Sequence, residues 1–142
     1  MTGFRRSVLL AAALATLVAC GSPRPRAGYR AFSDSYVFRI DADPQPPFAR
    51  EDIRYKVVVL DKDTNQPIEN GEGRIFAESR DGKRTWDGFA AGPEVGTYHA
   101  KLSYLTAGDW AVALEFRRDS AAAIERIDWM QQVQAERETV TP

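Results

Sequence analysis

The chain has 142 residues, of which 19 are Lys or Arg and 20 are Asp or Glu, so its formal net charge at pH 7 is only −1. Arg5 and Arg6 are the only charged residues among the first nineteen, which leaves 17 basic and 20 acidic residues in the rest of the chain. This mildly acidic balance, without a basic patch or tail, excludes the electrostatic footprint of a nucleic-acid-binding protein. The length is enough for one domain with a hydrophobic core.

The first residues have the layout of a secretory signal. Arg5 and Arg6 precede the run Val8–Ala19, which is apolar apart from Thr16. A bilayer core needs about 20 apolar residues, so this run is too short to span a membrane. It is typical of a signal peptide, which we place at residues 1–19.

The end of this run, Leu17-Val18-Ala19-Cys20 followed by Gly21, resembles a bacterial lipobox. The resemblance implies cleavage before Cys20, attachment of diacylglycerol to its thiol and acylation of the new amine. Two or more acyl chains give stable membrane anchoring, whereas one chain is marginal. Cys20 is the only cysteine, so no intramolecular disulfide can form and the core must hold the fold. The alternative interpretation is a cleaved, soluble secretory protein with one incidental cysteine.

A Pro-rich segment follows, and we expect residues 20–31 to form the lipidated cysteine and an extended tether. Gly21 occupies the position after the cysteine, where an aspartate commonly retains lipoproteins on the inner membrane. A glycine there predicts an outer-membrane address if the cell has an outer membrane. The expected location is the cell envelope, with the domain facing the periplasm or the cell exterior.

From about Phe32 the sequence alternates between apolar and polar residues, which is the pattern of strands with one buried face. The clearest stripes are at Tyr36, Phe38 and Ile40; at Ile53, Tyr55, Val57 and Val59; at Tyr98, Ala100, Leu102 and Tyr104; and at Trp110, Val112, Leu114 and Phe116. Further strands are expected over 73–79 and 83–89, separated by a turn signal at 80–82. Six to seven short strands at this spacing predict an all-β fold, an immunoglobulin-like antiparallel β-sandwich over residues 32–118.

The segment Gly96-Thr97-Tyr98 matches the pattern of a tyrosine corner. In immunoglobulin-like sandwiches this is a Tyr near the start of strand F whose hydroxyl bonds back to the chain. Ala100 would then take the place of a disulfide cysteine of antibody domains. The alternative is that Tyr98 is an ordinary core tyrosine.

Residues 119–142 change character and are rich in Ala, Glu and Gln, which are good helix formers. Their apolar residues recur every three positions, at Ile124, Ile127, Met130 and Val133. Asp119 or Ser120 can cap such a segment. We predict a C-terminal amphipathic helix packed on the sandwich, with a further strand around Ile127, Trp129 and Val133 as the alternative.

Two stretches carry a resemblance to a known family. The first, VVVLDKDTNQPIENG, is an expected strand followed by an acidic turn that contains a proline. The second, GTYHAKLSYLTAGDWAVALEF, contains two expected strands, which begin with Gly-x-Tyr and Gly-x-Trp. Together they resemble the FixH/YtkA-like immunoglobulin-type domains of bacterial envelope proteins, over roughly Asp52 to Arg117. The resemblance implies an extracytoplasmic accessory domain, and some members of the group are associated with copper handling or oxidase assembly. This sequence has no Met-rich or His-rich stretch between its third and fourth strands, unlike the copper-related members.

The segment Asp61–Glu72 has most of the ligand spacing of an EF-hand calcium loop, because Asp61, Asp63, Asn65 and Glu72 hold positions one, three, five and twelve. Position six is Gln66 where that loop needs a glycine, and strands are expected on both sides where it needs helices. Asp, Asn, Pro and Gly are also the residues that a hairpin loop uses. The sequence favours a solvated hairpin, with a metal site for calcium, ahead of copper, as the alternative.

Other candidate sites are sparse. His99 is the only histidine and is expected on the polar face of its strand, and no motif that pairs a histidine base with a nucleophile is present. Trp86, Phe89 and Trp129 are expected in the core. Aromatic residues are enriched at interfaces, so any of the three that proves exposed would mark a partner face.

These features predict a non-catalytic, lipid-anchored envelope protein without a cofactor. Its sandwich is expected to bind or scaffold another envelope component, with a protein as the expected partner and no nucleic acid. A metal-binding module using Asp61, Asp63, Asn65 and Glu72 is the alternative function. A small-molecule binder with a cleft between the sheets is a third hypothesis.

Overall fold

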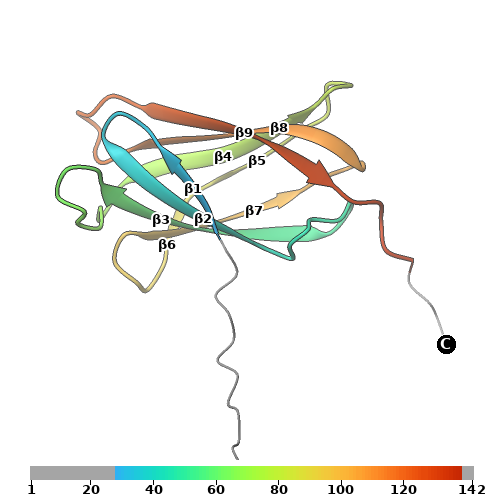
Figure 1. The fold of residues 1–142 in the computed structure, drawn as a ribbon, viewed down its shortest axis with the longest axis horizontal. Helices are drawn as coiled ribbons and strands as arrows, with labels where there is room; N and C mark the ends of the chain where they lie inside the picture. The colour runs from blue at the N-terminus through green and yellow to red at the C-terminus, as the bar shows by residue number, and fades with distance from the viewer. Residues whose placement is uncertain (1–27, 139–142) are drawn as a thin grey trace, which may run out of the picture.

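The computed structural model describes residues 28–138, and this part of the chain forms a β-sandwich of nine strands (Figure 1). The strands are β1 (Tyr29–Phe32), β2 (Tyr36–Asp43), β3 (Asp52–Asp61), β4 (Glu72–Ser79), β5 (Arg84–Gly88), β6 (Ala90–Ala91), β7 (Thr97–Ser103), β8 (Gly108–Arg117) and β9 (Glu125–Val133). The predicted signal peptide, Cys20 and most of the expected tether lie outside the described residues. Within residues 28–138, no helix is long and apolar enough to cross a membrane.

The strands form two antiparallel sheets in the order of an immunoglobulin-like domain. One sheet runs β1-β2-β3-β7-β6 and the other β5-β4-β8-β9. With β2, β3, β4, β6, β7, β8 and β9 as strands A to G, the sheets contain the orders A-B-E-D and C-F-G of a constant-type immunoglobulin domain. β1 and β5 extend the two sheets at their edges. The predicted sandwich is confirmed, with nine strands in the described residues where six to seven were expected.

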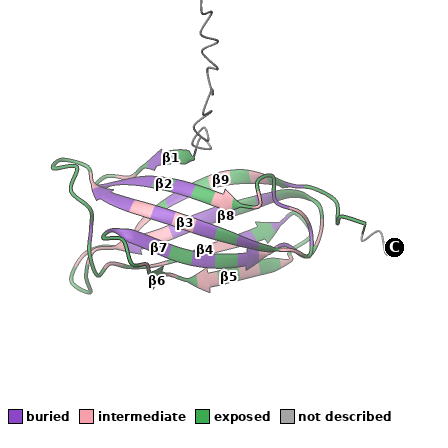
Figure 2. Cartoon of the chain, turned by 90° about the horizontal axis from the view of Figure 1, so that it is seen from below, coloured by how far each residue is buried: buried purple, intermediate pink, exposed green. Residues whose placement is uncertain are grey.

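The predicted apolar stripes form the core between the two sheets. Every member of the four stripes around β2, β3, β7 and β8 is buried, as the alternation predicted (Figure 2). The Phe116 ring centroid lies 5.1 Å from that of Tyr36, 6.1 Å from that of Phe38 and 5.3 Å from that of Tyr98, all close to edge-to-face. Such pairs contribute about 0.5–1.5 kcal/mol beyond their buried area. With a single cysteine in the chain, this packing takes the place of an inter-sheet disulfide.

The C-terminal segment contains the strand Glu125–Val133, so the helix predicted within residues 119–142 is wrong. β9 pairs with β8 along all nine of its residues. Ile127 and Val133 are buried and Trp129 is partly buried, whereas Met130 is 66% exposed, which is a period of two. Without β9, β8 would expose a row of unpaired backbone groups. Backbone pairing with β8 therefore outweighs the helix propensity of Ala, Glu and Gln. The strand that the sequence offered as the alternative is the structure observed.

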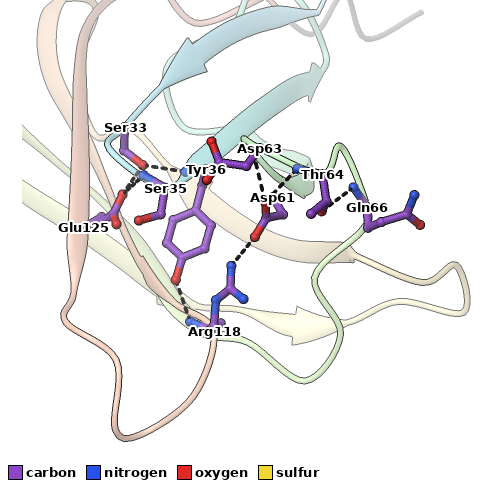
Figure 3. Close-up of polar contacts among 9 residues, drawn as sticks. All are labelled: Ser33, Ser35, Tyr36, Asp61, Asp63, Thr64, Gln66, Arg118 and Glu125. Carbon is purple, nitrogen blue, oxygen red and sulfur yellow. Dashed lines mark hydrogen bonds and ion pairs between the residues drawn. The ribbon is translucent and has the colours of Figure 1, made fainter.

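The sandwich extends beyond the expected domain limits at both ends, because β1 and β9 belong to it. Tyr29 on β1 and Trp129 on β9 have ring centroids 5.6 Å apart, which joins the edges of the two sheets. At the start of β9, the Glu125 carboxylate accepts hydrogen bonds from the Ser33 hydroxyl and the Ser35 backbone N–H (Figure 3). These contacts fasten β9 to the hairpin of β1 and β2.

Candidate functional site

The acidic segment Asp61–Glu72 begins as a tight antiparallel turn, as predicted, in which Leu60 bridges to Pro67. It then carries the chain to the other sheet, so it is a crossover and does not join two paired strands. β3 ends at Asp61 in the five-stranded sheet, and β4 begins at Glu72 in the four-stranded sheet. A tight turn opens the crossover, in which Asp61 Oδ1 accepts the backbone N–H groups of Asp63 and Thr64, both at 3.0 Å. Asn65 follows with a φ of 58°. Turn geometry therefore accounts for the Asp and Asn residues.

The predicted metal ligands do not form a cluster. Asp61 Oδ2 lies 2.5 Å from a guanidinium nitrogen of Arg118, and Glu72 Oε2 lies 2.7 Å from a guanidinium nitrogen of Arg117. Asp63 is exposed. Among residues 28–138, no group of three or more His, Cys, Asp or Glu side chains is placed to hold a metal ion. The carboxylates of Asp61 and Glu72 thus form ion pairs with neighbouring arginines.

The Asp61 ion pair belongs to a network at one end of the sandwich (Figure 3). The Thr64 backbone N–H, followed by the Arg118 side chain, lowers the pKa of Asp61 to about 2. The Arg118 guanidinium lies 5.7 Å from the ring centroid of Tyr36, and the Arg118 backbone N–H donates to the Tyr36 hydroxyl at 3.1 Å. These contacts connect the start of β2, the end of β3 and the residue after β8. Their role is therefore structural, because they hold the ends of these three strands together.

We expect Asp61→Asn to lower the Tm at neutral pH and to lose this deficit in acid. The folded-state pKa of about 2 lies below the value of about 3.9 for an ordinary Asp. The contribution of the ionised carboxylate is therefore complete above pH ~4 and disappears as the pH falls toward ~2. Thermal melts across this range should show the two proteins converging at low pH.

Asp63→Asn is the control for this experiment, because Asp63 is an exposed residue of the same turn. Its Tm should follow that of the wild type at every pH. A Tm deficit of Asp61→Asn that stayed constant down to the lowest pH would contradict the assigned ion pair.

A side chain near the start of strand F does bond back to the chain, but it is Trp110 and not Tyr98. Trp110 lies near the start of β8, and its Nε1–H donates to the carbonyl of Thr106, four residues upstream, at 2.9 Å. Tyr98 lies on β7, the strand E equivalent; its hydroxyl donates to the Ile68 carbonyl at 2.6 Å and accepts the Gly71 N–H at 2.8 Å. The predicted tyrosine corner is wrong because β7 occupies position E, where Tyr98 meets the β3–β4 crossover.

The remaining single candidates divide into surface and core. His99 is exposed, as the sequence predicted. Phe89 and Trp129 are partly buried and pack against the core. Trp86 is 70% exposed, so the expectation that it belongs to the core is wrong. The sequence around Trp86 does not predict which face of the sheet this side chain occupies, because β5 is short and its apolar and polar residues alternate only weakly.

An open groove of about 710 Å³ lies where β1 and β2 face β9. Its lining residues include the aromatic Tyr29 and Trp129 and the polar Asp41, Arg54 and His99. This is the kind of cleft that the small-molecule hypothesis requires. Its lining residues carry charges of both signs, so the groove does not favour one ligand class.

A second candidate surface is the outer face of the four-stranded sheet, which we call the Trp86 face. Its central apolar residues are Trp86 on β5, Phe76 on β4, Ala111 and Ala113 on β8, and Met130 on β9. The strand register places Phe76 between Trp86 and Ala113, and Met130 beside Ala111. Trp86 is 70% and Met130 is 66% exposed. These two side chains lie on the two edge strands of the sheet, and large exposed apolar side chains on one face make it a candidate interaction surface.

Arginine–carboxylate pairs surround these apolar residues. The closest N–O distances are 2.8 Å for Arg74–Glu115, 3.2 Å for Arg84–Glu78, 2.7 Å for Arg117–Glu72 and 2.7 Å for Arg126–Asp128. The guanidinium carbons of Arg74 and Arg126 also lie 5.2 Å and 5.1 Å from the ring centroid of Phe76. The four pairs therefore bring no net charge to the face, and two of their arginines, Arg74 and Arg126, pack against the Phe76 ring.

Comparison with known proteins supports the fold. No family model matches the sequence, and no curated protein matches it. A DUF4426 family protein from Pseudomonas aeruginosa is similar in structure, with a TM-score of 0.57, 11% identity, and coverage of 75% of this chain and 96% of that chain. A copper-bound variant of FetP from uropathogenic Escherichia coli has a TM-score of 0.52, 12% identity, and coverage of 82% and 96%. At these identities the likeness concerns the fold alone, and the class of protein defined here is an immunoglobulin-like β-sandwich domain.

Proposed function

We propose that this protein is a non-catalytic, lipid-anchored cell-envelope protein that binds another envelope component through the Trp86 face. The observation that carries the proposal is Trp86 itself, 70% exposed and directly opposite Phe76 on the neighbouring strand. Tryptophan and arginine are enriched at binding hot spots, and both occur here on paired strands. A preformed sheet face also lowers the ordering cost of binding.

The envelope location and the lack of catalysis rest on the sequence. The signal-like run and Cys20 support an anchor with two or more acyl chains. The single cysteine is assigned to that anchor, and the single histidine, His99, is exposed. The FixH/YtkA-like resemblance supports an extracytoplasmic accessory role.

A photo-crosslinking amino acid at position 86 tests the proposal in cells that make the full-length protein. We expect irradiation to give a discrete adduct from the membrane fraction, because a side chain at this position touches the bound component. The same amino acid at Phe32 is the matched control, since Phe32 is a 57% exposed aromatic on β1, in the other sheet. Adducts are measured by gel shift and mass spectrometry.

The Cys20→Ser variant tests the anchor in the same experiment. It should leave the membrane fraction, and the adduct formed from position 86 should decrease with it. Equal adduct yields from positions 86 and 32 would contradict the proposed face. Retention of Cys20→Ser in the membrane fraction would contradict the lipid anchor.

A metal-binding module is the alternative function, because FetP, whose fold is similar, is copper-bound in its solved structure. The contacts of Asp61 and Glu72 with Arg118 and Arg117 weigh against a calcium site in the crossover. A saturable rise in Tm with calcium that Asp61→Asn abolishes would support a calcium site, and a saturable rise in Tm with copper would support a copper site.

A further inference from the structure

The Trp86 face contains a shallow hollow whose lining is specific enough to indicate a ligand class. It has a volume of about 270 Å³, slightly below the 300–1,000 Å³ typical of small-molecule sites. It is lined by Arg74, Phe76, Ala77, Glu78, Arg84, Thr85 and Trp86. The hollow therefore suits a group about the size of one or two six-membered rings, bound against an aromatic wall.

The charges around the hollow do not suit an anion or a cation. The Arg84 guanidinium lies 3.2 Å from the Glu78 carboxylate, and that of Arg74 lies 2.8 Å from Glu115. A phosphate or a nucleic acid would compete with these carboxylates for the same guanidinium groups, and its binding depends on a surplus of positive charge. Charge complementarity thus favours an uncharged ligand.

The same side chains offer a dense mixture of hydrogen-bond donors and acceptors. The guanidiniums of Arg74 and Arg84 each carry five N–H donors in a planar fork, and the Glu78 carboxylate only accepts. These groups surround the exposed Trp86 ring and the Phe76 ring. A matching ligand therefore needs an apolar face and a rim of groups that donate and accept hydrogen bonds.

We propose that this hollow binds an uncharged saccharide, with Trp86 as the stacking residue and the Arg84–Glu78 pair as the hydroxyl-binding residues. This inference rests on the proposed function, and it names the chemistry of the component bound. A pyranose ring presents C–H bonds on its faces and hydroxyls at its rim. The C–H hydrogens carry slight positive charge and meet the negative face of the indole ring, while neighbouring hydroxyls reach the guanidinium and the carboxylate.

A protein partner fits the hollow less well. Charged residues are depleted from the cores of protein–protein interfaces, whereas the immediate neighbours of Trp86 in the hollow include Arg84, Glu78 and Arg74. Desolvating those pairs beneath an apolar partner surface would be costly. A hydroxyl-rich ligand replaces the water on these groups with hydrogen bonds of the same kind.

Titration of the full-length protein with three probes tests the inference. The probes are the linear tetrasaccharides of N-acetylglucosamine and of glucose, with inorganic phosphate as the charged comparison, in a detergent without a sugar headgroup. We expect saturable binding of at least one tetrasaccharide with a Kd of ~1 mM, the affinity of a small, shallow site. The readouts are tryptophan fluorescence and calorimetry.

Variants of the stacking residue provide the decisive comparison. Trp86→Ala should weaken saccharide binding by more than about tenfold, whereas Trp86→Tyr keeps an aromatic plane and should bind within about threefold of the wild type. Arg84→Met removes the guanidinium fork and should also weaken binding. Phe32→Ala, which removes an exposed aromatic from the other sheet, should bind as the wild type does.

The outcomes separate this inference from the proposed function. No saturable binding of either tetrasaccharide, binding that Trp86→Ala leaves unchanged, or binding of phosphate alone would overturn the saccharide inference. If the adduct at position 86 in cells then proves to contain a protein, the proposed function stands with a protein as the partner. If no adduct forms there either, both are overturned.

Discussion

Replacing Trp110 with alanine is expected to lower the free energy of unfolding by about 3–5 kcal/mol, the usual cost of truncating a buried aromatic side chain. Trp110 is fully buried, and its ring centroid lies 5.2 Å from that of Tyr104. The substitution opens a cavity between the sheets and removes the 2.9 Å hydrogen bond to the Thr106 carbonyl. Urea denaturation followed by far-ultraviolet circular dichroism measures the loss.

The other two tryptophans supply the controls for this measurement. Trp86→Ala should change the free energy of unfolding by less than about 0.5 kcal/mol, as expected for an exposed position, and Trp129→Ala should fall between the two. This ranking also establishes that Trp86→Ala is folded in the binding experiments. If Trp110→Ala were no more destabilising than Trp86→Ala, the assignment of Trp110 as the corner residue between the sheets would be wrong.

Tyr98→Phe should cost about 2–4 kcal/mol, although it removes only one oxygen, because two backbone groups lose their partner together. The hydroxyl binds the Ile68 carbonyl and the Gly71 N–H at 2.6 Å and 2.8 Å. The crossover packs so tightly there that a Cβ on Gly71 would lie 2.1 Å from the Phe116 ring. Water therefore has little room to replace the lost oxygen, and the cost appears in urea denaturation.

Hydrogen exchange distinguishes this local effect from general destabilisation. In Tyr98→Phe the Gly71 amide should exchange faster under conditions where the amides of β8 are unaffected. Tyr36→Phe is the comparison, since its hydroxyl accepts the Arg118 backbone N–H at 3.1 Å and does not contact the crossover near Gly71, and about 1 kcal/mol is expected. Unchanged exchange at Gly71 in Tyr98→Phe would show that the hydroxyl does not hold the crossover.

The sandwich was predictable because its core strands alternate. In β3, for example, Ile53, Tyr55, Val57 and Val59 are at most 1% exposed, and a period of two is what a strand with one buried face requires. The alternation is a local property, so it is legible without knowing which strands pair. The order of the strands in the sheets was not predictable in detail: the sequence indicated an immunoglobulin-like sandwich, but not which strand takes which position in it.

The candidate site was less predictable, because its features depend on which strands become neighbours. The spacing of Asp61, Asp63 and Glu72 resembled a calcium loop, yet the fold sets Asp61 against Arg118, 57 residues away, and Glu72 against Arg117. The Gly-x-Tyr and Gly-x-Trp strand starts looked alike, and only the sheet order decided that Trp110 forms the corner. For β9, pairing with β8 outweighed good helix formers, since backbone pairing depends on a partner far along the chain.

Periodicity and composition alone were sufficient for the all-β class, the inward stripes and the exposed position of His99, because each reflects short-range preferences of the residues themselves. The lipid anchor at Cys20 is a prediction of the same local kind and awaits its test. Tertiary structure alone decided that Trp86 faces solvent opposite Phe76, that four arginine–carboxylate pairs lie on the same sheet face, and that Asp61 pairs with Arg118. These properties arise from cross-strand neighbours, and the register that creates such neighbours is set by the packing of the whole sandwich.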